Sequence, residues 1–173
     1  MFTSLGIVDS LLIAVFPLAM IFAGLSDMLT MRISNKLSLV LIIGFAVFAA
    51  RIGLGWEQAG MHVLVAFAVL AIGFAGFSMG WMGGGDAKMA ASIALWFGGF
   101  HTLQFLLIAA VFGGALTLVI LFARRIPLPT AMADIGWVAR LHNATNGVPY
   151  GIALAAGALV IYPETLWLAA VLH

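Results

Sequence analysis

The stretch AGMHVLVAFAVLAIGFAGFSMGWMGGGDAKMA, residues 59–90, runs from an uncharged apolar segment into a glycine-rich turn that carries an acid and a base. The apolar part, 59–79, is long enough to cross the hydrocarbon core of a bilayer, for which about 20 residues are needed. Its apolar residues are continuous rather than alternating, so the pattern does not fit a lipid-facing β-strand. The stretch therefore predicts a membrane-spanning helix, because a helix satisfies its own backbone hydrogen bonds in lipid.

The composition extends this prediction to the whole chain. Of its 173 residues 65% are hydrophobic and 8% are charged, whereas a soluble domain has about 25% charged residues. We therefore expect an all-α, polytopic membrane protein with a single membrane-embedded domain over residues 1–173. The seven Lys and Arg residues are scattered, which argues against a nucleic-acid partner.

Metal and thiol chemistry is not indicated. The chain has no cysteine, which excludes disulfides, thiolate zinc sites and a cysteine nucleophile. Its four histidines have no metal-ligand spacing. We expect neither a metal nor an organic cofactor.

Six apolar segments predict about six transmembrane helices. The fourth segment is short and reaches the length of a span only with the glycine turn that precedes it. Glycines inside the segments, among them Gly73, Gly98 and Gly157, are interpreted as sites of close helix packing. The segments cover about 5–25, 37–54, 59–79, 87–100, 102–123 and 151–172.

Positive charge predicts the orientation. Cytoplasmic connections carry an excess of Lys and Arg, and the first, third and fifth connections hold all the basic residues except Arg51. Both termini are then expected on the non-cytoplasmic side. The polar stretch 123–149 becomes a cytoplasmic loop, in which Ile135, Val138 and Leu141 indicate a short interfacial helix. The alternative is an irregular loop.

This topology places two acids at one membrane depth. Asp27 closes the first span and Asp86 opens the fourth, both on the cytoplasmic side. Acids within spans usually face the bundle interior or a wet cavity. Two carboxyl groups that share a site hold one proton between them, so one can activate water while the other donates a hydrogen bond to a peptide carbonyl. Which aspartate has which role stays open, because such a pair titrates as a unit.

The three glycines before Asp86 fit this chemistry. Gly83, Gly84 and Gly85 have no Cβ, so they tolerate a positive φ and allow an extended peptide to approach the acid closely. They are candidate substrate-binding residues. The alternative is a plain turn in which Asp86 is the N-cap of the fourth helix.

Three stretches together resemble the type IV prepilin leader peptidases, a family of membrane aspartic proteases. MGGGDAK (82–88) resembles the family's Gly-x-Gly-Asp signature, and VPYGIALAAGAL (148–159) resembles the start of its last span. DMLTMRISN (27–35) resembles its other aspartate stretch, which ends in Ile-Pro-Asn; here Ser34 replaces the proline. The resemblance implies that Asp27 and Asp86 are the catalytic residues.

The resemblance also implies a substrate and a compartment. The substrate would be a prepilin-like membrane protein, cleaved after a glycine at the cytoplasmic face of the cell inner membrane. Longer members carry paired Cys-x-x-Cys motifs in an extra cytoplasmic region and also N-methylate the trimmed pilin. Since this chain lacks cysteine and that region, it is similar to the short, peptidase-only branch of Flp-type, tight-adherence pili.

Four further residues are weighed, two of which have two interpretations each. Lys88 could tune the charge of the aspartate pair or anchor the span end. Asn35 could form a hydrogen bond near the site or cap the second span. Both are retained as candidate substrate-binding residues. Pro149 and Tyr150 are expected to fix the start of the last span, with Tyr150 in the interfacial aromatic belt.

Two rival functions remain open from the sequence. A small ion transporter could also use paired carboxylates inside a membrane. A non-enzymatic subunit of a pilus or secretion assembly machine would use the aspartates only as helix caps. The oligomeric state and the identity of the pilin cannot be inferred.

Overall fold

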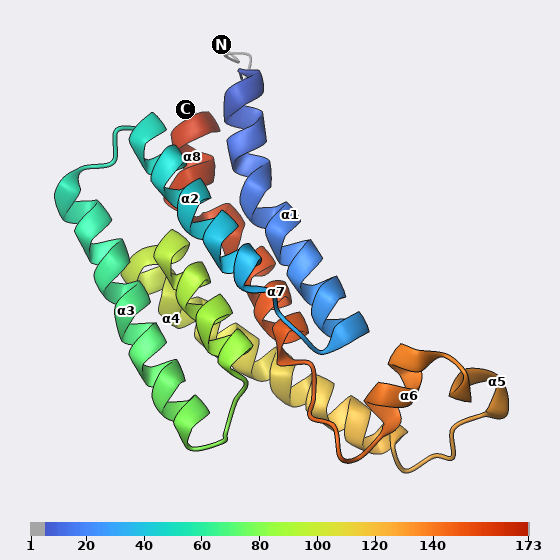
Figure 1. Cartoon of the computed structure of the whole chain (residues 1–173). Coiled ribbons are helices and arrows are strands. Elements are labelled where there is room, and N and C mark those ends of the chain that lie inside the picture. The colour runs from blue at the N-terminus through green and yellow to red at the C-terminus, as the bar shows by residue number, and fades with distance from the viewer. Residues whose placement is uncertain (1–5, 173) are drawn as a thin grey trace.

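The chain folds into a bundle of helices, described over residues 6–172 in a computed structural model (Figure 1). These residues contain no strand, which confirms the all-α class. Residues 1–5 and 173, which the predicted single domain includes, lie outside the described residues. The elements are α1 (Ile7–Thr30), α2 (Asn35–Arg51), α3 (Trp56–Ser78), α4 (Gly84–Ala123), α5 (Thr130–Ala133), α6 (Gly136–His142), α7 (Tyr150–Ile161), the 3₁₀ turn η1 (Tyr162–Glu164) and α8 (Leu166–Leu172).

Three helices in the described part of the chain are long and apolar enough to cross a membrane. They cover Val8–Thr30, Trp56–Ser78 and Gly84–Ala123. The helix α2 has 17 residues, and Tyr150–Glu164 forms a shorter apolar helix. The chain is thus a helical membrane protein, while the count of six spans remains a prediction.

Two predicted boundaries differ from the structure. The segments 87–100 and 102–123 correspond to the two halves of α4, which are divided at Gly98 rather than at residue 101, and the segment 151–172 is divided into α7, η1 and α8. The division follows from Pro163 in η1. A proline cannot donate a backbone hydrogen bond, so the regular α-helix ends at Ile161, just before the 3₁₀ turn that contains Pro163.

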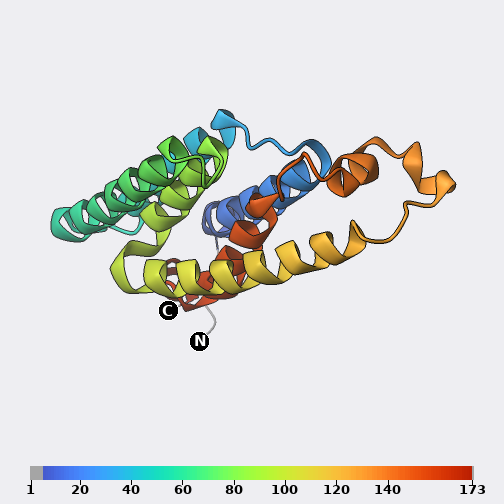
Figure 2. The same ribbon diagram turned by 90° about the horizontal axis from the view of Figure 1, so that it is seen from below.

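The helix α4 is broken at Gly98 and changes direction sharply there (Figure 2). Gly98 has φ 66° and ψ −157°, a conformation that is open to glycine and very costly for other residues. The prediction that Gly98 serves close helix packing is therefore incomplete, because its main role is conformational. The break returns the second half of α4 toward the end of the bundle at which the first half began (Figure 1).

Side chains from three elements satisfy the carbonyl groups that the break releases. The ring of His62 in α3 bonds through Nδ1 to the carbonyl oxygen of Leu95 at 2.8 Å. The hydroxyl group of Thr102 donates to the carbonyl of Ala94 at 3.4 Å, and the indole of Trp167 in α8 donates to the carbonyl of Trp96. Unpaired backbone groups are costly in an apolar interior, so these donors stabilise the break.

An aromatic cluster forms the core beside the break. Trp96 is fully buried, and its ring lies 5.2 Å from that of Phe16 and 5.1 Å from that of Trp167. Its Nε1 donates to the carbonyl of Leu41 in α2 at 2.9 Å. One side chain thus connects α1, α2, α4 and α8. This ties the first half of α4 to the rest of the bundle.

The connections between the helices lie at two opposite ends of the bundle. The described start of α1, the connection from α2 to α3 and the helix α8 lie at one end (Figure 1). The connections from α1 to α2 and from α3 to α4, and the start of α7, lie at the other end. The acids Asp27 and Asp86 therefore lie at the same end, as the charge pattern predicted.

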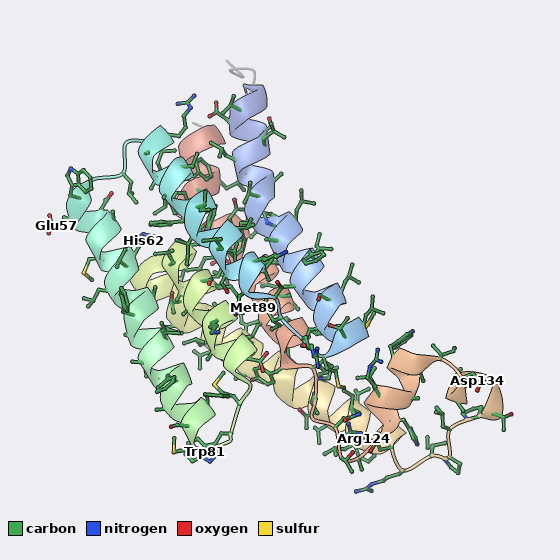
Figure 3. The ribbon with its side chains drawn as sticks, in the orientation of Figure 1. Glu57, His62, Trp81, Met89, Arg124 and Asp134 are labelled. Carbon is green, nitrogen blue, oxygen red and sulfur yellow. The ribbon has the colours of Figure 1, made fainter. Side chains whose placement is uncertain are left out.

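The polar stretch 123–149 holds two short helices, α5 and α6. The predicted interfacial helix corresponds to α6, which covers Gly136–His142. Arg124 ties this region to the end of α4, since its guanidinium donates to the carbonyls of Leu141, Asn146 and Gly147. Asp134 lies beyond α6 on the side away from the bundle (Figure 3).

Candidate active site

Asp27 lies near the C-terminal end of α1 and is only 5% exposed. Its Oδ2 accepts the backbone N–H of Gly151 at 2.7 Å. Gly151 is the second residue of α7, so the carboxyl group meets the N-terminus of that helix. Backbone N–H groups without partners make a helix N-terminus a favourable place for a carboxylate. The start of the last span thus holds the first aspartate in place.

Asp86 is the third residue of α4 and is half-buried. The N-cap of α4 is Gly83, so the alternative that Asp86 is the N-cap is wrong. Glycine can occupy an N-cap position although it offers no side-chain acceptor. The carboxyl of Asp86 is therefore in the first turn of the helix, beside the glycines.

The two aspartates line one cavity of about 370 Å³, which we call the aspartate cavity. The prediction that two acids distant in sequence meet at one end of the bundle agrees with this geometry. The other lining residues come from the connection after α1 and from the glycine turn: Met31, Arg32, Ile33, Gly83, Gly84 and Gly85.

The three glycines form one wall of the aspartate cavity, and this wall has no side chains. A Cβ on Gly83 would lie 3.0 Å from Oδ2 of Asp86, and one on Gly85 would lie 3.3 Å from Cβ of Ile33. These contacts lie within the protein, and the approach of a substrate peptide to the glycines stays a prediction. The expectation of positive φ is wrong, because the glycine with positive φ in this connection is Gly80, at 74°.

Lys88 and Asn35 meet beside this cavity rather than within its lining. The Nζ of Lys88 donates to Oδ1 of Asn35 at 3.1 Å, and both side chains are exposed. The interpretation of Asn35 as the cap of the second span is wrong. Ser34 is the N-cap of α2, and its hydroxyl accepts the backbone N–H of Lys36 at 3.2 Å. The serine that replaces the family's proline therefore has a capping role.

A second cavity, of about 660 Å³, adjoins Asp86; we call it the side chamber. The sequence did not single out two of its residues, Thr117 and Val148. Tyr150 also lines it, and the expected place of Tyr150 in an interfacial belt stays a prediction. Its half-buried ring packs against Gly113 of α4, and its hydroxyl donates to the carbonyl of Ala109 at 3.4 Å.

A model of the type IV leader peptidase family matches residues 14–118, more than half of the chain. The chain belongs to this family. The matched residues include Asp27, Asp86 and the glycine turn, whereas the Pro-Tyr-Gly stretch at 149–151 lies outside them. Comparison with curated proteins and with solved structures gave no match.

Membership of the type IV leader peptidase family makes the chain a membrane peptidase of the aspartic type with a prepilin-like substrate. The remaining acids are placed away from the aspartate cavity. Asp9 forms an ion pair with Arg51 at 3.2 Å, and Glu57 lies at the opposite end of α3 from Trp81 (Figure 3). Within residues 6–172, no three His, Asp or Glu side chains form a group that could hold a metal ion.

Proposed function

We propose that this chain cleaves the leader peptide of Flp-type prepilins after a glycine, with Asp27 and Asp86 as its catalytic pair. The observation that carries the proposal is that carboxyl groups from α1 and α4 line the same cavity. A wall of three glycines faces this cavity. A peptide backbone could lie against this wall within reach of both acids.

The proposed chemistry is hydrolysis by general acid and base catalysis. One carboxylate takes a proton from a water molecule as the water oxygen attacks the scissile carbonyl carbon. The other carboxyl group, which is protonated, donates a hydrogen bond to the carbonyl oxygen as negative charge develops on it. Collapse of the tetrahedral intermediate breaks the C–N bond, and the leaving nitrogen receives a proton from the pair.

We further propose that the site faces the cytoplasm of the inner membrane and that the enzyme does not methylate its product. The basic residues support the orientation, because all but Arg51 belong to the end of the bundle at which α4 begins (Figure 1). These residues are Arg32, Lys36, Lys88, Arg124, Arg125 and Arg140. The absence of cysteine from the 173 residues supports proteolysis without methyl transfer.

The test is cleavage by the purified protein in lipid vesicles. The substrate is a peptide with a polar leader, a glycine and one apolar helix, and mass spectrometry identifies the new N-terminus. Asp27→Asn and Asp86→Asn should each reduce the rate below roughly 0.1% of wild type, because neither amide can exchange the proton. Asp134→Asn, at the C-cap of α5, is the matched control and should leave the rate unchanged.

The rivals give different results in this assay. A transporter would leave the peptide intact in vesicles and would lose ion flux in the same variants. An assembly subunit would leave it intact and carry no flux. Normal cleavage by either aspartate variant would exclude the proposed pair. When a methyl donor is added to the assay, a mass increase of one methyl group on the product would exclude proteolysis without methyl transfer.

A further inference from the structure

We propose that the hydrogen bond between Lys88 and Asn35 holds two walls of the aspartate cavity together and thereby positions Asp86 relative to Asp27. The bond runs from Nζ of Lys88 to Oδ1 of Asn35 and is 3.1 Å long. This inference rests on the proposed function. It gives Lys88 and Asn35 a positioning role, in which neither side chain contacts the substrate.

The walls of the aspartate cavity come from two separate parts of the chain. One wall is the connection after α1, residues 31–33, and the other is the glycine turn that leads into α4. Asn35 is the first residue of α2 and follows the first wall, while Lys88 lies in α4, two residues after Asp86. A bond between these side chains therefore joins the ends of both walls.

Two contacts join the walls at this end of the bundle. Gly85 lies against Ile33, because a Cβ on Gly85 would be 3.3 Å from Cβ of Ile33. This contact prevents a closer approach of the walls but does little to prevent their separation. The bond from Lys88 opposes separation. Within the described residues 6–172, no other hydrogen bond joins residues 27–36 to residues 80–92.

The rest of the bundle does not depend on this bond. The indole of Trp96 donates to the carbonyl of Leu41 and joins α4 to α2 about two helical turns further along each helix. Loss of the Lys88 bond therefore frees the start of α4 without separating the two helices. Since Asp27 is held by Gly151, movement of the start of α4 changes the separation of the two carboxyl groups.

Lys88 is placed to act through position and not by contact with the acids. Neither Lys88 nor Asn35 lines the aspartate cavity. Residues two apart on a helix do not face each other, so the side chain of Lys88 leaves α4 on a different side from that of Asp86. Both Lys88 and Asn35 are exposed, and salt screens the charge of an exposed ammonium group.

The test measures single-turnover rates and KM for the peptide in lipid vesicles. Lys88→Met removes the donor and keeps the aliphatic stem, and Asn35→Ala removes the acceptor. Each should slow cleavage roughly 10-fold and change KM less than about twofold, because a displacement of about 1 Å lowers the rate of the chemical step. The double variant should be no slower than the slower single variant, since both changes remove the same bond. Lys88→Arg keeps a donor and should retain most of the rate.

The matched control is Lys36→Met. It removes another exposed positive charge at the same end of the bundle, and the side chain of Lys36 takes no part in the bond to Asn35. Its rate should equal that of the wild type. A charge effect of Lys88 on the acids would shift the pH profile of Lys88→Met and leave Asn35→Ala unaffected. Contact with the substrate would raise KM in both variants. Either result would overturn the positioning role.

The proposed function and this inference fail differently. If the wild type leaves the peptide intact, the proposed function fails. If the wild type cleaves but both single variants match its rate, or their effects add in the double variant, the inference fails and the proposed function stands. The Tm in detergent shows whether each variant is folded. If Lys88→Met is unfolded, Asn35→Ala decides, and a wild-type rate in that variant overturns the inference.

Discussion

Asp27 of α1 and Gly151 of α7, separated by 124 residues, are joined by a hydrogen bond of 2.7 Å from the backbone N–H to Oδ2. The contact leaves no space for a side chain, because a Cβ on Gly151 would lie 2.7 Å from Oδ2 and 2.8 Å from Cδ1 of Ile33. The N-terminus of the last long helix thereby determines where the first aspartate stands. The position of a catalytic candidate depends on a glycine from the other end of the chain.

Gly151→Ala should reduce kcat by roughly 100-fold, because a displacement of a catalytic group by about 1 Å can have that effect. Helix stability is not the cause, since alanine favours a helix more than glycine does. Gly24→Ala is the matched control at the same α1–α7 contact, where a Cβ would meet Ala155 at an ordinary 3.4 Å. The measurement is single-turnover cleavage in vesicles. Equal activity of the two variants would contradict a positioning role for Gly151.

Alanine at the three glycines of the turn should affect cleavage in a fixed order. Gly83→Ala should reduce it most, because its Cβ would lie 3.0 Å from the carboxyl of Asp86. Gly85→Ala should be intermediate, with a contact of 3.3 Å to Ile33, and Gly84→Ala should be mildest, with 3.4 Å to the ring of Phe77. Initial rates in vesicles give the order. Equal rates would show that the wall does not require the absence of a Cβ.

Gly98→Ala should destabilise the protein by roughly 1–3 kcal/mol, because alanine disfavours the backbone conformation at the break. Its Cβ would also lie 3.0 Å from Nε2 of His62. This corresponds to a decrease in Tm of several degrees for a chain of this size, measured in detergent. Gly99→Ala is the control, because a Cβ there would meet open space. An unchanged Tm for Gly98→Ala would mean that the break can move.

Arg124→Lys should loosen the segment 127–147 without affecting the bundle. The guanidinium donates to three carbonyl groups at once, and the single ammonium of lysine cannot reproduce that fork. Limited proteolysis should therefore cut this segment several times faster in the variant. Arg125→Lys is the control, since Arg125 lies over the ring of Phe122 and takes no part in these bonds. Equal cleavage of both variants would show that Arg124 does not tether the segment.

The sequence predicts the placement of the aspartates but not their support. Basic residues at alternate connections are enough to put Asp27 and Asp86 at one end, because charge controls topology. The hydrogen bond from the backbone N–H of Gly151 to Asp27 forms only when α7 docks against α1. No local sequence pattern predicts that contact. Ser34 and Asn35 are adjacent and have equal preference for an N-cap, so the sequence could not decide between them.

The sequence predicts a break near residue 101 but does not place it at Gly98. Gly98 and Gly99 are neighbours of the same type, and either could interrupt a helix. What selects Gly98 is the set of distant donors that reach the carbonyls before it, from His62, Thr102 and Trp167. The contact of Tyr150 with Gly113 was not predicted, because nothing in the local sequence links the start of α7 to a glycine in the second half of α4.

The bond from Trp167 to the carbonyl of Trp96 has a consequence for biosynthesis. These residues are 71 positions apart, so the residues around the break at Gly98 are synthesised long before Trp167, whose indole donates to the carbonyl of Trp96. Until α8 docks, the carbonyl of Trp96 lacks this side-chain donor. We therefore expect the protein to reach its folded state only after α8 has been inserted. A truncated product that lacks α8 is expected to be degraded.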